Sequence, residues 1–202
     1  NSALNIANAG SSITDIAGNT PISTLAAPGE AGSLGANADL VIDTARPTIN
    51  GVSSATDNGS YGIGDVINLT VAFSENVLVN TSGGTPTLQL ETGTTDREAT
   101  YLSGTGTNSL TFRYIVQEGD SSADLDQHSS SALVLNGGSI ADAVGNSAVL
   151  TLAEPGEAGS LAANADLVID TTRPSVTGVS SATENGSYGI GEVIQLTVTF
   201  DK

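Results

Sequence analysis

The chain lacks cysteine, methionine and tryptophan altogether, and it has only five basic residues against 22 acidic ones. Without cysteine there are no disulfides, but a unit of about 100–150 residues can bury enough core to fold without them. The absence of cysteine and methionine also leaves little that oxidises easily, which suits exposure outside the cell. The net charge of −17 argues against nucleic acid and anionic membranes as partners, because both would be repelled. Divalent cations, in contrast, are attracted to such a chain.

Long apolar runs and enzyme motifs are missing as well. No run approaches the roughly 20 residues of a membrane-spanning helix, so we expect no membrane insertion in this segment. No export signal and no GxSxG, HExxH or Walker-type motif is present. The only histidine, His128, lies in a serine-rich acidic loop, where a solvated role is far commoner than a catalytic one. We therefore predict that the protein is not an enzyme.

What the chain does contain is an internal repeat. Residues 30–43, EAGSLGANADLVID, return as EAGSLAANADLVID at 157–170, an offset of 127 residues (157 − 30). The offset also relates the segments 53–73 and 180–200. Copies this similar indicate that one structural unit is duplicated in tandem. We predict three parts: the C-terminal part of a preceding repeat (1–43), a complete repeat (44–170) and the N-terminal strands of a following repeat (171–202).

Short runs of alternating apolar residues recur between turn-forming residues, a pattern typical of β-strands. The clearest runs are 65–74 and 109–116. Further strands are expected at 47–52, 77–79, 86–91, 98–102, 132–135, 148–152 and 166–170. About seven to nine strands in a unit, with a turn roughly every 8–12 residues, predict an all-β, immunoglobulin-like β-sandwich repeated in tandem at the 127-residue period. At most one helical turn is expected, near residues 140–144.

Acidic residues in turns are the candidate functional groups. Asp120, Asp124 and Asp126 lie in one short loop. With serine hydroxyls and backbone carbonyls, these three carboxylates form a plausible cage for calcium, which takes about 6–8 oxygen ligands. A solvated loop whose aspartates cap turns explains the same pattern. The residues alone leave both interpretations open.

A second set of candidate calcium ligands belongs to the expected repeat junctions. Asp43 and Asp170 end strands just before the linkers that lead to Arg46-Pro47 and Arg173-Pro174. Further candidates lie in turns that the fold could bring to one pole of a unit: Asp57, Asp65, Asp142, Asn146, Glu184 and Glu192. Asp57 and Asp65 become Glu184 and Glu192 in the second copy, a change that a ligand or a surface charge tolerates better than a turn-forming aspartate does. Against ligation, Asp-x-x-Gly-Asn at Asp142 is in itself a good β-turn.

Several segments of the sequence together resemble a known protein family. GDVINLTVAFSENVLV (64–79), GTPTLQLETG (84–93), ATYLSGTGTNSLTFRYIVQEGDSSADLD (99–126), LVLNGGSIADAVGN (133–146) and LVIDTARP (40–47) together resemble the tandem immunoglobulin-like (cadherin-like) modules of giant bacterial surface adhesins. They are similar to the repeats of swimming-motility surface proteins and of RTX-type adhesins. The resemblance covers essentially the whole chain, although the GGxGxD nonapeptides of an RTX block are missing. It implies secretion to the cell surface or the extracellular matrix, and calcium that rigidifies the junctions.

Two classes of function follow as expectations. The first is a structural spacer, stalk or filament-forming repeat of a long extracellular adhesin or biofilm matrix protein, with neighbouring repeats, and other copies in a fibre, as its partners. The alternative is a glycan- or protein-binding adhesion module, or a strand-sharing filament subunit. In the strand-sharing case, however, nothing at the two ends replaces the strands that match residues 76–127.

Overall fold

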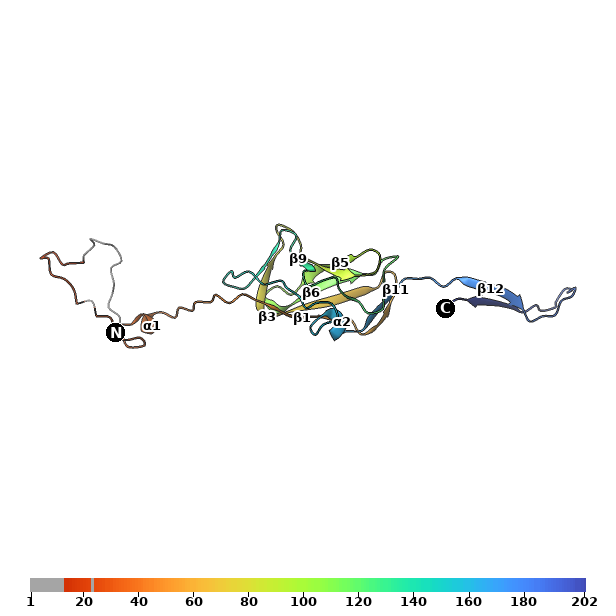
Figure 1. Ribbon diagram of the computed structural model, residues 1–202, viewed down its shortest axis with the longest axis horizontal. Coiled ribbons are helices and arrows are strands. Elements are labelled where there is room, and N and C mark those ends of the chain that lie inside the picture. The colour runs from red at the N-terminus through yellow and green to blue at the C-terminus, as the bar shows by residue number, and fades with distance from the viewer. Residues whose placement is uncertain (1–12, 23) are drawn as a thin grey trace. The chain divides into compact units, whose positions relative to one another are not determined.

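The computed structural model describes residues 13–22 and 24–202, which divide into a unit ending at Thr44 and a unit spanning Ala45–Lys202 (Figure 1). The first unit overlaps the segment 1–43 that the repeat predicts, of which residues 1–12 and 23 lie outside the described residues. The fold is all-β, with 38% of residues in strands and 4% in helices. Its sheets are antiparallel and curled, which is consistent with a β-sandwich. Among the described residues, no helix has the length and apolarity needed to cross a membrane.

The second unit is organised around one large antiparallel sheet. Its strands follow the order β1 (Ile49–Ser54), β3 (Val66–Asn80), β6 (Thr107–Ile115), β5 (Arg97–Ser103), β4 (Thr87–Glu91) and β8 (Asp126–Gln127). Two short strands, β9 (Leu133–Val134) and β10 (Ser139–Ala141), pair with β4 and β3. A smaller sheet has the order β2 (Gly59–Tyr61), β11 (Leu167–Asp170) and β7 (Ser121–Ser122), with β2 and β11 parallel.

The core lies where the alternating residues of β3 and β6 face each other. Leu69 pairs with Phe112 and Val71 pairs with Leu110, and all four side chains are fully buried. The rings of Tyr101 and Phe112 pack edge to face with their centroids 5.8 Å apart. Each large apolar side chain buried in this way contributes about 1.5–3 kcal/mol to folding. The alternation seen in the sequence thus places one face of each strand in the core.

Several element predictions need correction. The runs 65–74 and 77–79 form the single strand β3, whose register with β6 shifts between Ala72 and Val77; such a bulge bends a strand without ending it. The expected strand at 148–152 is wrong: its backbone amides bond in turn to Ile140, Pro47 and Ser130, so no continuous ladder forms. The helical turn expected near 140–144 is also wrong, because β10 occupies residues 139–141.

The two helices are single turns that the sequence pattern missed, α1 (Leu34–Asn37) and α2 (Leu161–Asn164). A serine caps each of them. Ser33 Oγ accepts a hydrogen bond from the backbone N–H of Ala36, and Ser160 Oγ accepts one from Ala163, both at 3.2 Å. A capped turn of this kind is specified by nearby residues. The two copies of the segment therefore form the same local structure.

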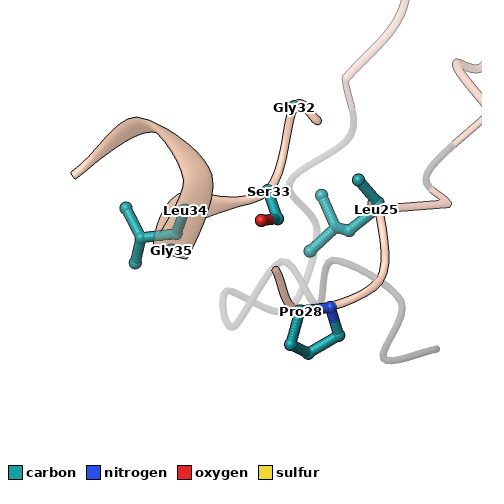
Figure 2. Close-up of a pocket in the computed structure, with 7 residues that line it drawn as sticks. Leu25, Pro28, Gly32, Ser33, Leu34 and Gly35 are labelled. Carbon is teal, nitrogen blue, oxygen red and sulfur yellow. The ribbon is translucent and has the colours of Figure 1, made fainter. Parts of the chain in front are cut away.

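The surroundings of the two copies nevertheless differ. Leu161 is completely buried, whereas Leu34, its counterpart 127 residues earlier, is 70% exposed. In the first unit Leu34 lines an apolar hollow together with Leu25, Pro28 and Ser33 (Figure 2). Leu152 and Leu161, which match Leu25 and Leu34, are both buried in the second unit. The residues that line the hollow thus match residues that are buried in the second unit.

The C-terminal hairpin repeats β1 and β3 in the same manner. β12 (Val176–Ser181) pairs with β13 (Leu196–Phe200), and its register shifts between Val176 and Gly178. The β1–β3 pair has the matching shift between Ile49 and Gly51. Phe73 is buried, but its counterpart Phe200 is half exposed. The sequence of the hairpin fixes its register and its bulge, whereas its burial requires the other strands of a repeat.

Candidate cation-binding residues and the repeat junction

The first candidate calcium cage, in the loop 119–127, is separated by the fold. Asp120 is buried, and its Oδ1 accepts a hydrogen bond from Arg97 Nε at 2.7 Å. Its Oδ2 accepts hydrogen bonds from the Tyr114 hydroxyl at 2.5 Å and from the backbone N–H of Gln117 at 2.8 Å. Burial, and then the Asp120 carboxylate, raise the pKa of Tyr114 above its usual value, so this phenol remains a hydrogen-bond donor.

The other two carboxylates of this loop have different surroundings. Asp126 is also buried; its Oδ2 accepts a hydrogen bond from the Gly156 amide at 2.7 Å, and its Oδ1 accepts one from the Leu161 amide at 3.0 Å. Asp124 is exposed, and its Oδ1 is 3.5 Å from the backbone nitrogen of Leu167. Buried polar groups need such partners. Asp120 and Asp126 are therefore buried and held by protein donors, rather than solvated as the alternative interpretation expected, and calcium binding by this loop stays a prediction.

Asp142 and Asn146 form a closed turn. Asp142 Oδ1 accepts hydrogen bonds from three backbone amides, those of Val144, Gly145 and Asn146, at 2.7–2.9 Å. Its Oδ2 accepts one from Asn146 Nδ2 at 2.7 Å. Asp15 and Asn19, their counterparts in the first unit, repeat the same side-chain contacts although both are exposed. The turn is therefore encoded locally, and four donors bond to the two oxygens of the Asp142 carboxylate.

These hydrogen bonds make stability depend on pH. Burial raises the pKa of Asp142, but the hydrogen bonds, led by that from the Asn146 side chain, outweigh burial and hold the pKa below its ordinary value. A carboxyl whose pKa is lower in the folded state stabilises the protein above its unfolded pKa, about 3.9, and this contribution is lost as the pH falls through the folded value. We expect the stability advantage of the natural chain over Asp142→Asn to be constant above about pH 5 and to shrink below about pH 4.

Urea unfolding followed by circular dichroism, from pH 7 down to pH 2, measures this difference directly. Asp124→Asn is the matched control, because it removes an exposed carboxylate of the same type. Parallel stability curves for the natural chain and Asp142→Asn across the whole range would contradict the expectation.

The paired turn residues of the two copies also have capping roles. Gly62 donates its backbone N–H to Asp65 Oδ2 at 2.8 Å, and Gly189 donates the corresponding N–H to Glu192 Oε2. The carbonyl oxygens of Asp57 and Glu184 accept hydrogen bonds from the hydroxyls of Tyr61 and Tyr188. Glu192 thus caps the same amide as Asp65. For Asp65 and Glu192, the exchange of aspartate for glutamate therefore gives no preference for metal ligation over turn capping.

The junction between residues 170 and 171 carries two ion pairs. Asp170 Oδ2 lies 2.7 Å from Lys202 Nζ, and Arg173 lies 3.6 Å from Glu118. The hydrogen bond from Lys202, followed by those from Thr172, lowers the pKa of Asp170 to about 2. The linker is anchored too, since Thr171 Oγ1 donates to the carbonyl of Asp120 at 2.7 Å. Residues 170–173 therefore contact both Lys202, which follows β13, and the loop that contains Glu118 and Asp120.

The repeat offset relates these junction residues to equivalent positions in the preceding copy. Asp170 and Lys202 stand 127 residues after Asp43 and Glu75, so a position that is acidic in one copy is basic in the next. Asp43 is exposed and belongs to the first unit, whereas Glu75 lies in β3 with its carboxylate within 4.8 Å of that of Asp142. The sequence analysis missed both Glu75 and Lys202. The signal that could have found them is the alignment of the two copies, in which Glu75 matches Lys202.

Comparison with known proteins adds no functional assignment. No protein family model, curated protein or solved structure matches the chain. The resemblance to surface adhesins therefore stays a prediction that rests on the sequence segments quoted above. In the described part of the chain, side chains do form groups that could hold a metal ion, and one such group consists of Glu91, Asp96 and His128.

Proposed function

We propose that the chain is a structural spacer, a stalk segment of immunoglobulin-like β-sandwiches in tandem, from a long extracellular adhesin or biofilm matrix protein. The observation that carries the proposal is the junction at residue 170. There a short linker joins two copies of one sequence, and Asp170 binds Lys202 of the next copy at 2.7 Å. A spacer needs length and stiffness rather than varied surfaces, and an array of near-identical units with anchored linkers provides both.

Calcium at such junctions is the second part of the proposal. Where the Lys202 ammonium faces Asp170, the preceding copy has Glu75 at the position of Lys202 and Asp43 at that of Asp170. Two equivalent junctions would thus place a carboxylate opposite a carboxylate in one case and opposite an ammonium in the other. Carboxylates that face each other repel, a cation between them relieves that repulsion, and calcium prefers oxygen ligands of this kind. In this proposal Lys202 replaces the ion at its own junction.

The proposal predicts how an array responds to calcium. Three linked copies of residues 44–170 have Asp170 followed by the next copy's Glu75 at each junction. We expect small-angle X-ray scattering to give a larger maximum dimension and less flexibility in calcium than in chelator. The same array with Glu75→Lys in every copy should remain extended in both solutions, because each junction then has the ion pair that Asp170 and Lys202 form.

An array with Glu154→Lys is the matched control, since it adds the same charge at another exposed position of each copy. This control should respond to calcium like the natural array. Equal scattering of the natural array in calcium and in chelator would remove the calcium part of the proposal. If scattering shows that the Glu75→Lys array is flexible at its junctions in both solutions, the proposal of a stiff spacer is contradicted.

A further inference from the structure

We propose that Glu91, Asp96 and His128 form a binding site for a borderline transition-metal cation, Zn²⁺ or a close relative, at the edge of the main sheet. The proposal does not depend on the spacer function or on calcium. The site uses the only histidine of the chain. The three side chains come from the end of β4, from the turn before β5 and from the residue after β8.

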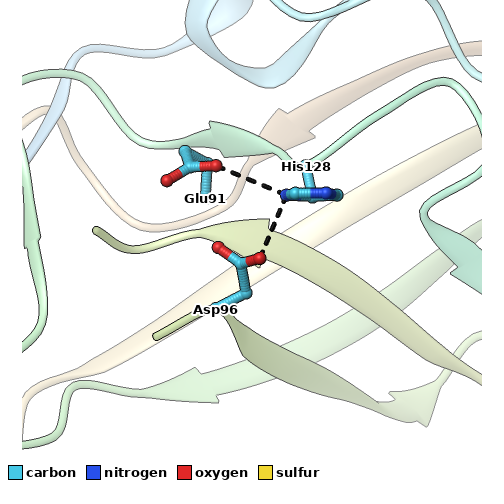
Figure 3. Close-up of side chains that lie close together, drawn as sticks. All are labelled: Glu91, Asp96 and His128. Atoms are coloured by element: carbon cyan, nitrogen blue, oxygen red, sulfur yellow. Dashed lines mark ion pairs between the residues drawn. The ribbon is translucent and has the colours of Figure 1, made fainter. Parts of the chain in front are cut away.

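The three groups converge on one point, as Figure 3 shows. His128 Nδ1 lies 3.3 Å from Glu91 Oε2 and 3.2 Å from Asp96 Oδ2. All three ligand atoms lie within 4.8 Å of one another. A single atom of each residue is therefore directed at a shared centre. An imidazole nitrogen and two carboxylate oxygens make a mixed donor set, which differs from a simple cluster of acids.

The spacing fits a bound cation better than a direct ion pair. Zinc binds histidine nitrogen at about 2.0–2.1 Å and carboxylate oxygen at about 2.0–2.2 Å, so two tetrahedral ligands are roughly 3.4 Å apart. The two observed separations, 3.2 and 3.3 Å, are close to that value. A charge-assisted hydrogen bond from an imidazolium would be shorter, about 2.7–2.9 Å. Such shorter bonds occur elsewhere in this protein, for example between Arg97 and Asp120 at 2.7 Å.

The backbone that carries the three ligands is held in place without a metal. Glu91 pairs with Asp126 across β4 and β8, and the His128 amide donates to the carbonyl of Gln89 at 3.0 Å. The turn that leads to Asp96 is closed by Thr92, whose Oγ1 donates to the carbonyl of Thr95 at 2.8 Å. Ligands on fixed strands require little reorganisation on binding, which favours affinity.

The donor set selects the class of ion. Calcium takes about 6–8 oxygen ligands and magnesium keeps several waters, so neither gains from an imidazole. Zinc and its neighbours accept imidazole together with carboxylate. The adjacent cation, Arg97, is already engaged with buried Asp120. Three protein ligands leave a fourth tetrahedral position for water or for a donor from another molecule.

A single histidine makes the test specific. The full chain, labelled with ¹⁵N, is titrated with ZnCl₂ in a tenfold excess of CaCl₂, and the ring nitrogens of His128 are observed by NMR. We expect saturable shifts of the Nδ1 signal and one zinc per chain by calorimetry. Glu91→Gln, Asp96→Asn and His128→Gln should each weaken zinc binding at least about tenfold, because each removes one of three ligands. Glu154→Gln, an exposed acid far along the chain, should leave the affinity unchanged.

Three results would overturn the proposal. The ring signals of His128 could remain unchanged while zinc saturates the chain, which would place the metal on other carboxylates. His128→Gln could bind zinc as tightly as the natural chain. Calcium could displace zinc at equal concentration, which would mark a site for hard cations. The ring titration uses the natural chain, so its outcome does not depend on whether the variants fold.

Discussion

Replacing Asp120 with alanine is expected to lower the free energy of unfolding by about 3–5 kcal/mol. The change removes the acceptor of three hydrogen bonds, from Arg97, from the Tyr114 hydroxyl and from the Gln117 amide. It also leaves a guanidinium, only a quarter exposed, without its counter-ion. Removing one partner of a buried pair leaves the other charge uncompensated, which is why the expected effect is large. Equilibrium denaturation in urea, followed by circular dichroism, measures it.

Tyr114→Phe is the matched variant, because it keeps the contact between Arg97 and Asp120 and removes only the hydroxyl. Its expected cost is about 1.5–3 kcal/mol, the range for a hydrogen bond to a charged group. Both measurements are made in calcium and in chelator. The structural role predicts equal losses in the two solutions. A loss from Asp120→Ala that occurs only in calcium would instead show that this carboxylate belongs to a metal cage.

The strands were the part of the fold that the sequence could predict. Alternation at 65–74 and 109–116 carries local information, because every second side chain of a strand faces the core, and Leu69 and Phe112 do face each other. The bulge within β3 escaped prediction, since SEN at 74–76 reads as a break in the alternation. Single helical turns such as α2 are too short for a 3.6-residue period to be detected, although Ser160 is a recognisable cap.

The hydrogen bonds of the acidic loop 119–127 could not be predicted, because the partners of its carboxylates lie far along the chain. Asp120 pairs with Arg97, which is 23 residues away, and Asp126 accepts from Leu161, which is 35 residues away. Spacing within a loop contains no information on such partners. The turn at Asp142 differs, since all of its described donors lie within four residues. Here the local sequence contains the donors that close the turn, and calcium ligation by Asp142 and Asn146 stays a prediction.

The internal copies separate what local sequence determines from what packing determines. Asp15 and Asp142 make the same turn, and Ser33 and Ser160 cap the same helical turn, whether or not a sheet surrounds them. Burial behaves differently, since Leu34 is exposed and Leu161 is not. Local contacts therefore determine these turns, whereas the hydrophobic gain depends on the sheet that packs around them. An array assembled from such units gains stability mainly within each repeat.

Replacing Asp126 with alanine is the second change with a large expected effect, about 1–3 kcal/mol, which is the cost of leaving one buried donor, the Gln127 amide, unsatisfied. The Gly156 amide loses its acceptor at 2.7 Å, and the Gln127 amide loses one at 2.8 Å. The Leu161 amide keeps a partner, because Gln127 Oε1 accepts from it at 2.9 Å. Urea denaturation measures the loss, and amide hydrogen exchange shows where it arises.

Asp126→Asn is the matched variant, because its amide keeps one oxygen acceptor of nearly the same shape, so it should cost less than the alanine change. Amide hydrogen exchange at Gly156 should accelerate in both variants, and more in Asp126→Ala than in Asp126→Asn. Exchange at Phe112, in the core, should change only with global stability. A cost below about 1 kcal/mol for Asp126→Ala would mean that water replaces the carboxylate. In that case Asp126, although buried in the structure, would again be a candidate for an exposed calcium-binding loop.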